Sequence, residues 1–265
     1  MSGYTDVVIG TGPLGRAVIN ELQTRGREVR AVNRSGTGNM PADVHLESAD
    51  LSDPEAARRV LTGAERIFFC AQPPYEQWAM LFPPLIEGVI AGVSAVKATL
   101  IYAGNLYVYG KQTNPFSEEM PFRVTGPKGG ARVQVEERLL EAHALGEIEV
   151  AIGRASDFYG PRVIQSSVGE QIFGAAVRGK TANVLGDPDL PHTYTYIRDF
   201  ARGLVTLADH EEALGEVWHI PSAPTITTRE FVELINDQVD NPIKIRSASG
   251  FMVSFLGLFN RDLRA

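Results

Sequence analysis

The chain has 265 residues but only one cysteine, Cys70, which excludes an internal disulfide and a zinc site built from several cysteines. Its five histidines show no two-histidine spacing of the metalloprotease type, and no G-x-S-x-G elbow supplies a hydrolase nucleophile. We therefore expect a protein that binds no metal. The scarcity of cysteine also fits a reducing compartment, and we expect a cytoplasmic location.

Positive charge is in short supply as well. The 25 lysines and arginines are outnumbered by 32 aspartates and glutamates, so the formal net charge is -7 at pH 7. Nucleic acids and anionic membrane surfaces both attract proteins that carry a concentrated positive field. We therefore expect neither nucleic acid nor a membrane as a partner, and we expect a small molecule as the substrate.

Long hydrophobic runs are missing too. The longest apolar tract, residues 78–103, is interrupted by Pro83, Pro84, Glu87 and Lys97, and the N-terminus has no basic region followed by an apolar run. The tract therefore predicts a helix followed by a strand rather than a membrane span. Since 44% of the residues are hydrophobic, the chain can still bury a large core.

What the chain does contain is an alternation of β-rich runs with amphipathic segments, which predicts a Rossmann-type α/β fold with a doubly wound parallel sheet. The β-rich runs are residues 6–9, 28–32, 66–70, 99–102 and 149–152. Beyond residue 160 the alternation is less regular, with helical stretches at 168–177 and 199–208. We expect residues 1–160 to form a dinucleotide-binding domain and residues 161–265 a smaller substrate-binding lobe, interleaved with the last sheet elements.

The first β-rich run leads into a G-x-G-x-x-G turn and then a helix that begins near Pro13. The turn consists of Gly10, Thr11, Gly12, Pro13, Leu14 and Gly15. In such turns the glycines permit a tight bend, a close approach of the backbone to a pyrophosphate, and close packing of helix on strand. The helix N-terminus then stabilises the phosphate charge. The turn predicts a dinucleotide site, and a purely structural glycine turn is the alternative.

The residues after the second run indicate which dinucleotide binds. NAD-specific proteins usually place an acidic side chain there for the ribose 2′-hydroxyl, whereas this chain has Asn33, Arg34 and Ser35. Because Arg34 can pair with a 2′-phosphate and Ser35 adds a hydroxyl, we expect NADP(H), with NAD(H) less favoured. A solvated loop arginine is the alternative. Farther along, Asp50 and the adjacent Leu51 are expected near the adenine, while Asp53 also fits a helix cap.

At this point the chain resembles the extended and atypical short-chain dehydrogenase/reductase superfamily, in particular its NAD-dependent epimerase/dehydratase group. The resemblance covers nearly the whole chain, and it implies the Rossmann fold, a nicotinamide dinucleotide and an oxidoreductase-type activity. Its carriers are the glycine turn, the segment 50–53, the strand and turn 100–110, the run 153–161 and the segment 195–201.

The resemblance also implies where the remaining site residues lie. It places Ala71, Gln72 and Pro73, together with Ala155, Ser156 and Phe158, against the cofactor. We also expect Tyr107, Asp157, His192 and Tyr194 near the substrate, with either Tyr107 or Tyr109 as a candidate replacement for the family's proton donor. For the tyrosines of the 100–110 turn, and for Asp157 and His192, packing, turn or surface roles are the alternatives.

The chain departs from the family where catalysis takes place. The family has a serine or threonine three residues before the valine of its V-Y-G turn, where this chain has Asn105. The family's Tyr-x-x-x-Lys pair corresponds to Lys128 and Arg132. These two residues share a helical face with Val135 and Leu139, which favours a cofactor-facing role over a solvated one.

The replacements leave three functional hypotheses. The first is an NADP(H)-dependent oxidoreductase that reduces a small carbonyl or conjugated substrate, with Lys128 as proton donor, Arg132 on the ribose and Asn105 on the substrate carbonyl. In having a lysine at the tyrosine position, the chain also resembles the isoflavone-reductase-like enzymes, which reduce ethers and conjugated double bonds. The second is a nucleotide-sugar epimerase or dehydratase, although those reactions use the missing tyrosine. The third is a regulatory protein that binds NADP(H) without catalysis.

The C-terminal stretch 251–259 is apolar, and the chain stops at residue 265, whereas chains that resemble it continue for some tens of residues. We expect a truncated lobe, whose exposed apolar patch would favour a homodimer.

Overall fold

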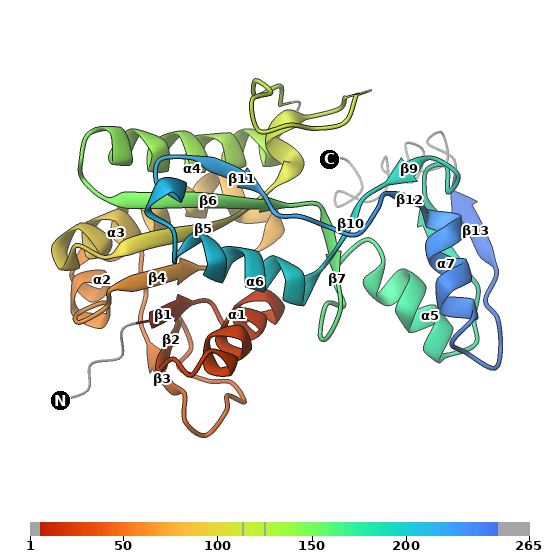
Figure 1. Cartoon of the computed structure of the whole chain (residues 1–265), viewed down its shortest axis with the longest axis horizontal. Coiled ribbons are helices and arrows are strands. Elements are labelled where there is room, and N and C mark those ends of the chain that lie inside the picture. Colours follow the sequence, from red (N-terminus) through yellow and green to blue (C-terminus); the bar gives the residue numbers. More distant parts are fainter. Residues whose placement is uncertain (1–5, 113, 125, 249–265) are drawn as a thin grey trace. The chain divides into compact units, whose positions relative to one another are not determined.

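Seven parallel strands form the central sheet of the protein in a computed structural model, which describes residues 6–112, 114–124 and 126–248. The strand order is β11-β6-β5-β4-β1-β2-β3, and every neighbouring pair is parallel (Figure 1). The strands are β1 (Asp6–Ile9), β2 (Val29–Asn33), β3 (His45–Ser48), β4 (Arg66–Phe69), β5 (Thr99–Asn105), β6 (Glu149–Ala155) and β11 (Val217–His219). This order places the glycine turn after β1 in the interior of the sheet, between β4 and β2, which run in the same direction as β1.

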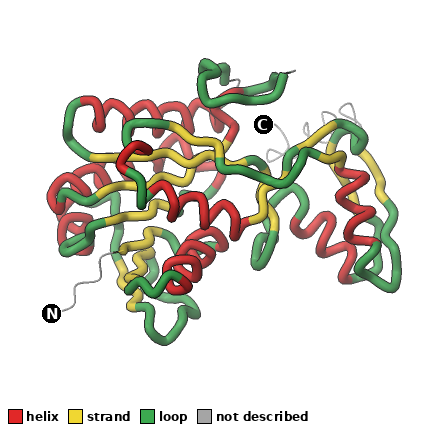
Figure 2. The backbone as a smooth tube through the Cα atoms, viewed as in Figure 1, coloured by secondary structure: helices red, strands yellow, loops and turns green. Residues whose placement is uncertain are grey.

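Helices cover both faces of this sheet, as the alternating pattern predicted (Figure 2). On one face α2 (Pro54–Val60), α3 (Trp78–Val96) and α4 (Pro127–Ala144) pack side by side over Val7, Ile67 and Leu100. On the other face lie α1 (Pro13–Thr24), which contacts β1 and β2, and α6 (Ile197–Leu207), whose Leu204 closely approaches Gly153 of β6. The predicted doubly wound α/β fold is therefore confirmed.

The apolar tract at 78–103 is a helix followed by a strand, as predicted. By length and composition, the segment Tyr75–Val96 is one that could cross a membrane, with a mean hydropathy of 1.7. This segment comprises a short 3₁₀ turn, η1 (Tyr75–Gln77), and α3. The composition of α3 has a packing explanation, because Phe82, Ile86 and Val89 belong to the buried core between the sheet, α2 and α4.

The chain divides into two compact units, one made of Met1–Ala155 and Arg198–Pro221, the other of Ser156–Ile197 and Ser222–Ala265. Residues 156–160, which we expected in the dinucleotide-binding domain, belong to the second unit. Residues 198–221, which we expected in the lobe, belong to the first unit because β11 extends the main sheet beside β6. The strand pattern of β11 was too short to detect in the sequence, since it spans only three residues.

The second unit is built from short elements around Phe231, Tyr194 and Ile172. Three two-stranded sheets pair β10 with β7, β12 with β9 and β13 with β8. The expected helix at 168–177 is a π-helical turn, η3, followed by a single α-helical turn, α5. The apolar stretch 251–259 lies outside the described residues. The elements are β7 (Asp157–Tyr159), η3 (Gly169–Phe173), α5 (Gly174–Val177), β8 (Ala182–Leu185), β9 (Pro191–His192), β10 (Tyr194–Tyr196), β12 (Ile226–Thr227), α7 (Thr228–Asn236) and β13 (Ile245–Ala248).

A buried ion pair connects α4 to the sheet in the first unit. Glu136 of α4 accepts hydrogen bonds from Arg154 of β6, one of them at 2.9 Å from Nε, and both side chains are almost fully buried. Burial raises the pKa of the Glu136 carboxyl, and the Arg154 guanidinium acts against this by stabilising the charged form. Arg154 also donates to the Tyr109 hydroxyl, which lies 2.7 Å from Nε2 of His219 on β11. The network therefore holds α4, β6, β11 and the turn after β5 together.

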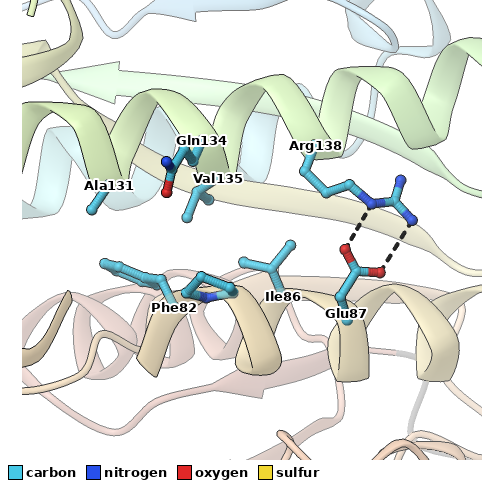
Figure 3. Close-up of a pocket in the computed structure, with 8 residues that line it drawn as sticks. Phe82, Ile86, Glu87, Ala131, Gln134, Val135 and Arg138 are labelled. Carbon is cyan, nitrogen blue, oxygen red and sulfur yellow. Dashed lines mark hydrogen bonds and ion pairs between the residues drawn. The ribbon is translucent and has the colours of Figure 1, made fainter. Parts of the chain in front are cut away.

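Replacement of Arg154 by methionine should lower the free energy of unfolding by about 3–5 kcal/mol, because it leaves the Glu136 carboxylate buried without its cation. Arg138→Met is the matched control. Arg138 pairs with Glu87 across the surface of α3 and α4, beside a cleft lined by Phe82, Ile86 and Val135 (Figure 3), and its loss should cost less than about 1 kcal/mol. Urea unfolding of both variants measures the two losses. Equal losses would contradict a special role for the buried pair.

Candidate functional site

The glycine turn after β1 is shaped by contacts of its first and third glycines. Gly10 has a φ of +94°, and a Cβ on it would lie 2.6 Å from the backbone nitrogen of Ala71. A Cβ on Gly15 would lie 1.8 Å from the carbonyl oxygen of Gly10. Both positions therefore require glycine for reasons internal to the fold, namely a left-handed backbone and the close packing of α1 on β1.

Gly12 differs, because nothing inside the protein requires a glycine there. Its φ of -69° suits any residue, and a Cβ would meet no atom within 4 Å. Gly12 is exposed at the N-cap of α1, where helix N–H groups point outward, and Pro13 occupies the first helical position. An open, glycine-lined space at a helix N-terminus fits the diphosphate of a dinucleotide, which needs a close approach to the backbone.

The loop after β2 is organised by Asn33. Its amide nitrogen donates to the Thr11 hydroxyl at 2.7 Å and to the Thr37 carbonyl at 2.9 Å, while its Oδ1 accepts from the Gly36 N–H and the Ser35 hydroxyl. These bonds join the loop to the glycine turn. The side chains of Asn33, Thr11 and Ser35, all expected to face the cofactor, are thus engaged mainly with one another, and they fix the loop that presents Arg34.

Arg34 lies at the surface of this loop, close enough to Asp50 for its charge to matter there. Asp50 accepts hydrogen bonds from the side chain and the backbone of Ser52, and these bonds, with a smaller contribution from Arg34, hold its pKa below the ordinary value. Asp53 accepts from the Glu55 N–H and caps α2. Leu51 is buried in the core, so only its backbone can face a ligand.

A second arginine on the same side was not identified from the sequence. Arg16 directly follows the third glycine, and its Nε donates to the Thr11 carbonyl at 3.1 Å. It also donates to the Asn39 carbonyl, so its guanidinium spans from the glycine turn to the loop after Arg34. The sequence does show a basic residue in the first turn of α1. It does not show that this residue reaches the loop after Arg34, because Asn39 lies 23 residues farther along the chain.

Arg132 is held in a cage of aromatic and polar side chains below the loop that follows β4. It donates to the Tyr102 hydroxyl at 2.6 Å and to Oε1 of Gln72 at 2.8 Å, and its guanidinium lies 4.3 Å from the Trp78 ring. Trp78 in turn donates to the Pro73 carbonyl, which ties this cage to the same loop. Arg132 is buried, and its Nε has no hydrogen-bond partner among the residues that the structure describes.

Lys128 lies one helical turn before Arg132 and contacts an aromatic ring. Its ammonium is 4.0 Å from the ring centroid of Tyr75, and the Tyr75 hydroxyl donates to the Tyr107 hydroxyl at 3.0 Å. Asn105 ends β5, where it pairs with Ala155 of β6, and its Oδ1 accepts from the Tyr107 N–H at 3.1 Å. The amide NH₂ of Asn105 therefore remains the group with which it can bind a substrate oxygen.

The second unit brings its own predicted residues together. Oδ2 of Asp157 lies 3.2 Å from Nε2 of His192 and accepts from the Ser167 hydroxyl at 3.0 Å. Burial acts to raise the pKa of the Asp157 carboxyl, but the bonds from His192 and Ser167 outweigh it and hold the pKa below its usual range. The centre of the His192 ring lies 4.6 Å from that of the Tyr194 ring, with the two planes tilted by 45°, and the Tyr194 hydroxyl is hydrogen-bonded to the Thr228 hydroxyl.

Two predicted cofactor residues, Ser156 and Phe158, also belong to this second unit. Ser156 donates to the Thr193 carbonyl at 2.6 Å, and Phe158 lies in β7, opposite Thr195 of β10. Across the residues that the structure describes, no group of three or more histidine, cysteine, aspartate or glutamate side chains is placed to hold a metal ion.

Alanine substitutions at two glycines of the turn should separate an effect on stability from an effect on dinucleotide binding. Gly12→Ala should leave the free energy of unfolding unchanged, because its Cβ enters open space, yet weaken dinucleotide binding about tenfold or more. Gly15→Ala should lower stability by about 1–3 kcal/mol, because the new Cβ meets a backbone oxygen that cannot move away alone. Urea unfolding and a fluorescence titration with NAD(H) and NADP(H) measure both effects. Undiminished binding by Gly12→Ala would place the diphosphate elsewhere.

Comparison with known proteins agrees with this geometry. Residues 7–220 match the model of the NAD-dependent epimerase/dehydratase family. The UDP-N-acetyl-alpha-D-glucosaminuronate decarboxylase of Bacillus cytotoxicus is 24% identical over 259 residues, covering 89% of this chain and 80% of that protein. The UDP-glucose 4-epimerase of Streptomyces lividans is 25% identical, covering 80% of this chain and 70% of that protein.

Solved structures show the same fold at low identity. The UDP-N-acetylglucosamine 4-epimerase from Methanobrevibacter ruminantium M1 superposes with a TM-score of 0.80 at 17% identity, covering 94% of this chain and 87% of that one. The UDP-glucuronic acid 4-epimerase from Bacillus cereus, in complex with UDP-glucuronic acid and NAD, gives 0.79 at 17%, covering 92% and 86%. Since the family model spans most of the chain and the glycine turn fits a diphosphate, this protein belongs to the NAD-dependent epimerase/dehydratase family of nicotinamide-dinucleotide-dependent enzymes.

Proposed function

We propose that the protein transfers a hydride between a nicotinamide dinucleotide and a carbon of a nucleotide sugar that carries a hydroxyl or carbonyl group. The observation that carries this proposal is the open space at Gly12, on the N-terminus of α1, in a turn built for a diphosphate. Bound nicotinamide would supply or remove the hydride. The residues of this chain would hold the dinucleotide, orient the substrate oxygen and exchange its proton.

The substrate class rests on the relatives. The decarboxylase and the epimerase that match most of this chain both act, by their names, on UDP-linked sugars, and so does the Bacillus cereus epimerase. This favours a nucleotide sugar over the small carbonyl compound that we expected first. In the second unit, Asp157, His192 and Tyr194 form a polar and aromatic cluster suited to a hydroxyl-rich ligand.

Reduction of a small carbonyl or conjugated substrate by NADPH is the second candidate. One feature of the sequence supports it: the motif spacing predicts Lys128 and Asn105 at the positions of the family's tyrosine and its serine or threonine. Nucleotide-sugar epimerases and dehydratases rely on that tyrosine as acid and base, whereas a one-way reduction needs only a single proton donor. The two candidates share the cofactor site and differ in the substrate and in the fate of the cofactor.

For the cofactor itself we infer a preference for NADP(H). Arg34 and Arg16 both lie at the loop after β2, where the adenosine ribose of a bound dinucleotide would be expected, and no acidic side chain occupies positions 33–35. Two guanidinium groups favour a 2′-phosphate over a 2′-hydroxyl because charge-assisted, forked hydrogen bonds match phosphate geometry. The Bacillus cereus epimerase was solved with NAD, so the preference in this chain would be a departure from that protein.

Arg34→Ala should weaken NADP binding by about 1.5–3 kcal/mol through the loss of a charge-assisted contact, and should leave NAD binding nearly unchanged. Arg59→Ala, which removes an exposed arginine from α2, serves as the control and should alter neither affinity. Titration of each variant with both dinucleotides measures the ratio. A variant that still prefers NADP as strongly as the parent protein would remove Arg34 from the 2′-phosphate site.

Two substrate panels should separate the candidate reactions. In the first panel the protein is incubated with UDP-glucose, UDP-glucuronic acid or UDP-N-acetylglucosamine and catalytic dinucleotide, and sugar products are followed by NMR. In the second, NADPH consumption is followed with aldehydes, ketones and enones. We expect conversion in the first panel without net consumption of cofactor. Turnover only in the second would establish the reductase, and tight dinucleotide binding without turnover in either would overturn both.

A further inference from the structure

A tyrosine pair beside a lysine lies at the end of β5, and the sequence alone did not associate its three members. The Tyr75 hydroxyl donates to the Tyr107 hydroxyl at 3.0 Å, and the Lys128 ammonium lies 4.0 Å from the centre of the Tyr75 ring. Tyr75 begins η1, Tyr107 lies in η2 (Leu106–Tyr109) and Lys128 lies in the first turn of α4. Three separate segments of the first unit thus converge on one spot, which we call the Tyr75–Tyr107–Lys128 cluster.

The backbone around Tyr107 is held firmly enough to position its side chain. The Asn105 side chain caps η2 by accepting a hydrogen bond from the Tyr107 N–H. This bond fixes the backbone of Tyr107 relative to the end of β5. A Cβ on Gly129 would lie 3.1 Å from the Tyr107 carbonyl oxygen, so glycine lets the first turn of α4 approach η2 closely. The Trp78 ring packs against both tyrosine rings. Its centroid lies 4.6 Å from the centroid of the Tyr75 ring and 6.3 Å from that of the Tyr107 ring.

The cluster is open to solvent and adjoins the Arg132 cage. The exposed fractions of Tyr75 and Tyr107 are 38% and 41%, so a ligand or water can reach them. Trp78 contacts both tyrosine rings and also the Arg132 guanidinium. A phenol hydroxyl therefore lies near the position from which the family's tyrosine is missing, but it comes from a different segment of the chain.

From this geometry we propose that Tyr107 exchanges the proton with the substrate oxygen, that Tyr75 relays that proton to solvent, and that Lys128 is a positioning residue. The proposal rests on the hydride-transfer function proposed above. In the reducing direction, a hydride adds to the carbonyl carbon while the Tyr107 O–H bond breaks and its proton forms the new O–H bond of the alcohol. The Tyr107 oxygen then takes the proton of Tyr75, and Tyr75 takes one from water.

The donor arrangement favours Tyr107 over Lys128 as the proton source. The hydrogen bond donated by Tyr75 stabilises the negative charge that Tyr107 acquires when its proton leaves. Lys128 is attracted to the Tyr75 ring face only while its nitrogen keeps its positive charge, which opposes its action as a donor. Its retained charge also stabilises the negative charge on Tyr75, the ring that it contacts, when Tyr75 passes its proton to Tyr107.

Four variants test these roles once a substrate has been found with the two panels. Tyr107→Phe should lower kcat/KM about 100-fold, with dinucleotide affinity unchanged. Tyr75→Phe should lower it about tenfold, because water can replace the relay. Lys128→Met should lower it, whereas Lys128→Arg should restore most of the activity, since arginine keeps the charge but cannot give up a proton near neutrality. Tyr196→Phe, in the second unit, is the matched control and should behave as the parent protein.

A second measurement needs neither cofactor nor turnover. With fluorotyrosine in place of Tyr107, the fluorine NMR signal of the unliganded protein should move on Tyr75→Phe and on Lys128→Met, but not on Tyr196→Phe. A signal that Tyr75→Phe leaves in place would show that the two hydroxyls do not interact.

The outcomes distinguish this proposal from the function on which it rests. If the parent protein converts a substrate but Tyr107→Phe keeps its activity within about threefold, Tyr107 is not the donor and the hydride-transfer function stands. If Lys128→Arg is as inactive as Lys128→Met while Tyr107→Phe is active, Lys128 itself donates the proton. If the parent protein converts nothing in either panel, the proposed function and this assignment are both overturned.

Discussion

The buried ion pair between Glu136 and Arg154 is the constraint on which the candidate site depends. Lys128, Arg132 and Glu136 follow one another at intervals of four along α4, so they lie on one face of the helix. Glu136, the last of the three, is anchored to β6 and through Tyr109 to β11. This ion pair fixes the rotation of α4 about its axis and its position along that axis. Arg132 can therefore donate to Gln72, and Lys128 can contact the Tyr75 ring. A buried Glu136 or Arg154 charge without its partner would be energetically unfavourable. The ion pair therefore resists any displacement of α4 from β6.

The other half of the site depends on backbone rather than on side chains. Gly10 and Gly15 let strand, helix and the β4 loop approach one another more closely than any Cβ would permit. The result is a helix N-terminus that opens onto free space at Gly12, with Asn33 fixing the adjoining loop. Binding and chemistry are thus assigned to different structural devices. The dinucleotide would be held by main-chain geometry at β1 and β2, whereas proton exchange would take place among side chains from η1, η2 and α4.

Membership of the family settles the cofactor class more firmly than the reaction. Relatives that match most of the chain act by their names on UDP sugars, yet the sequence predicts Lys128 and Asn105 at the positions of the family's tyrosine and hydroxyl residue. The Tyr75–Tyr107–Lys128 cluster offers a physical way to reconcile these observations, because a phenol supplied from η2 can serve a substrate bound at the end of β5. Lys128 and Arg132 are then cations that stabilise charge, and neither has to give up a proton.

The sequence by itself determined the doubly wound sheet, the glycine turn, the helix-and-strand reading of residues 78–103 and the family. These features depend on local periodicity, on glycine positions and on residues adjacent in the chain, all of which a sequence displays directly. Only the tertiary structure decided that Tyr75 meets Tyr107, that Arg16 reaches the loop at Asn39, and that residues 198–221 return to the first unit. Each of these contacts joins segments more than 20 positions apart in the chain. They depend on how separate elements pack in three dimensions, which no local pattern encodes.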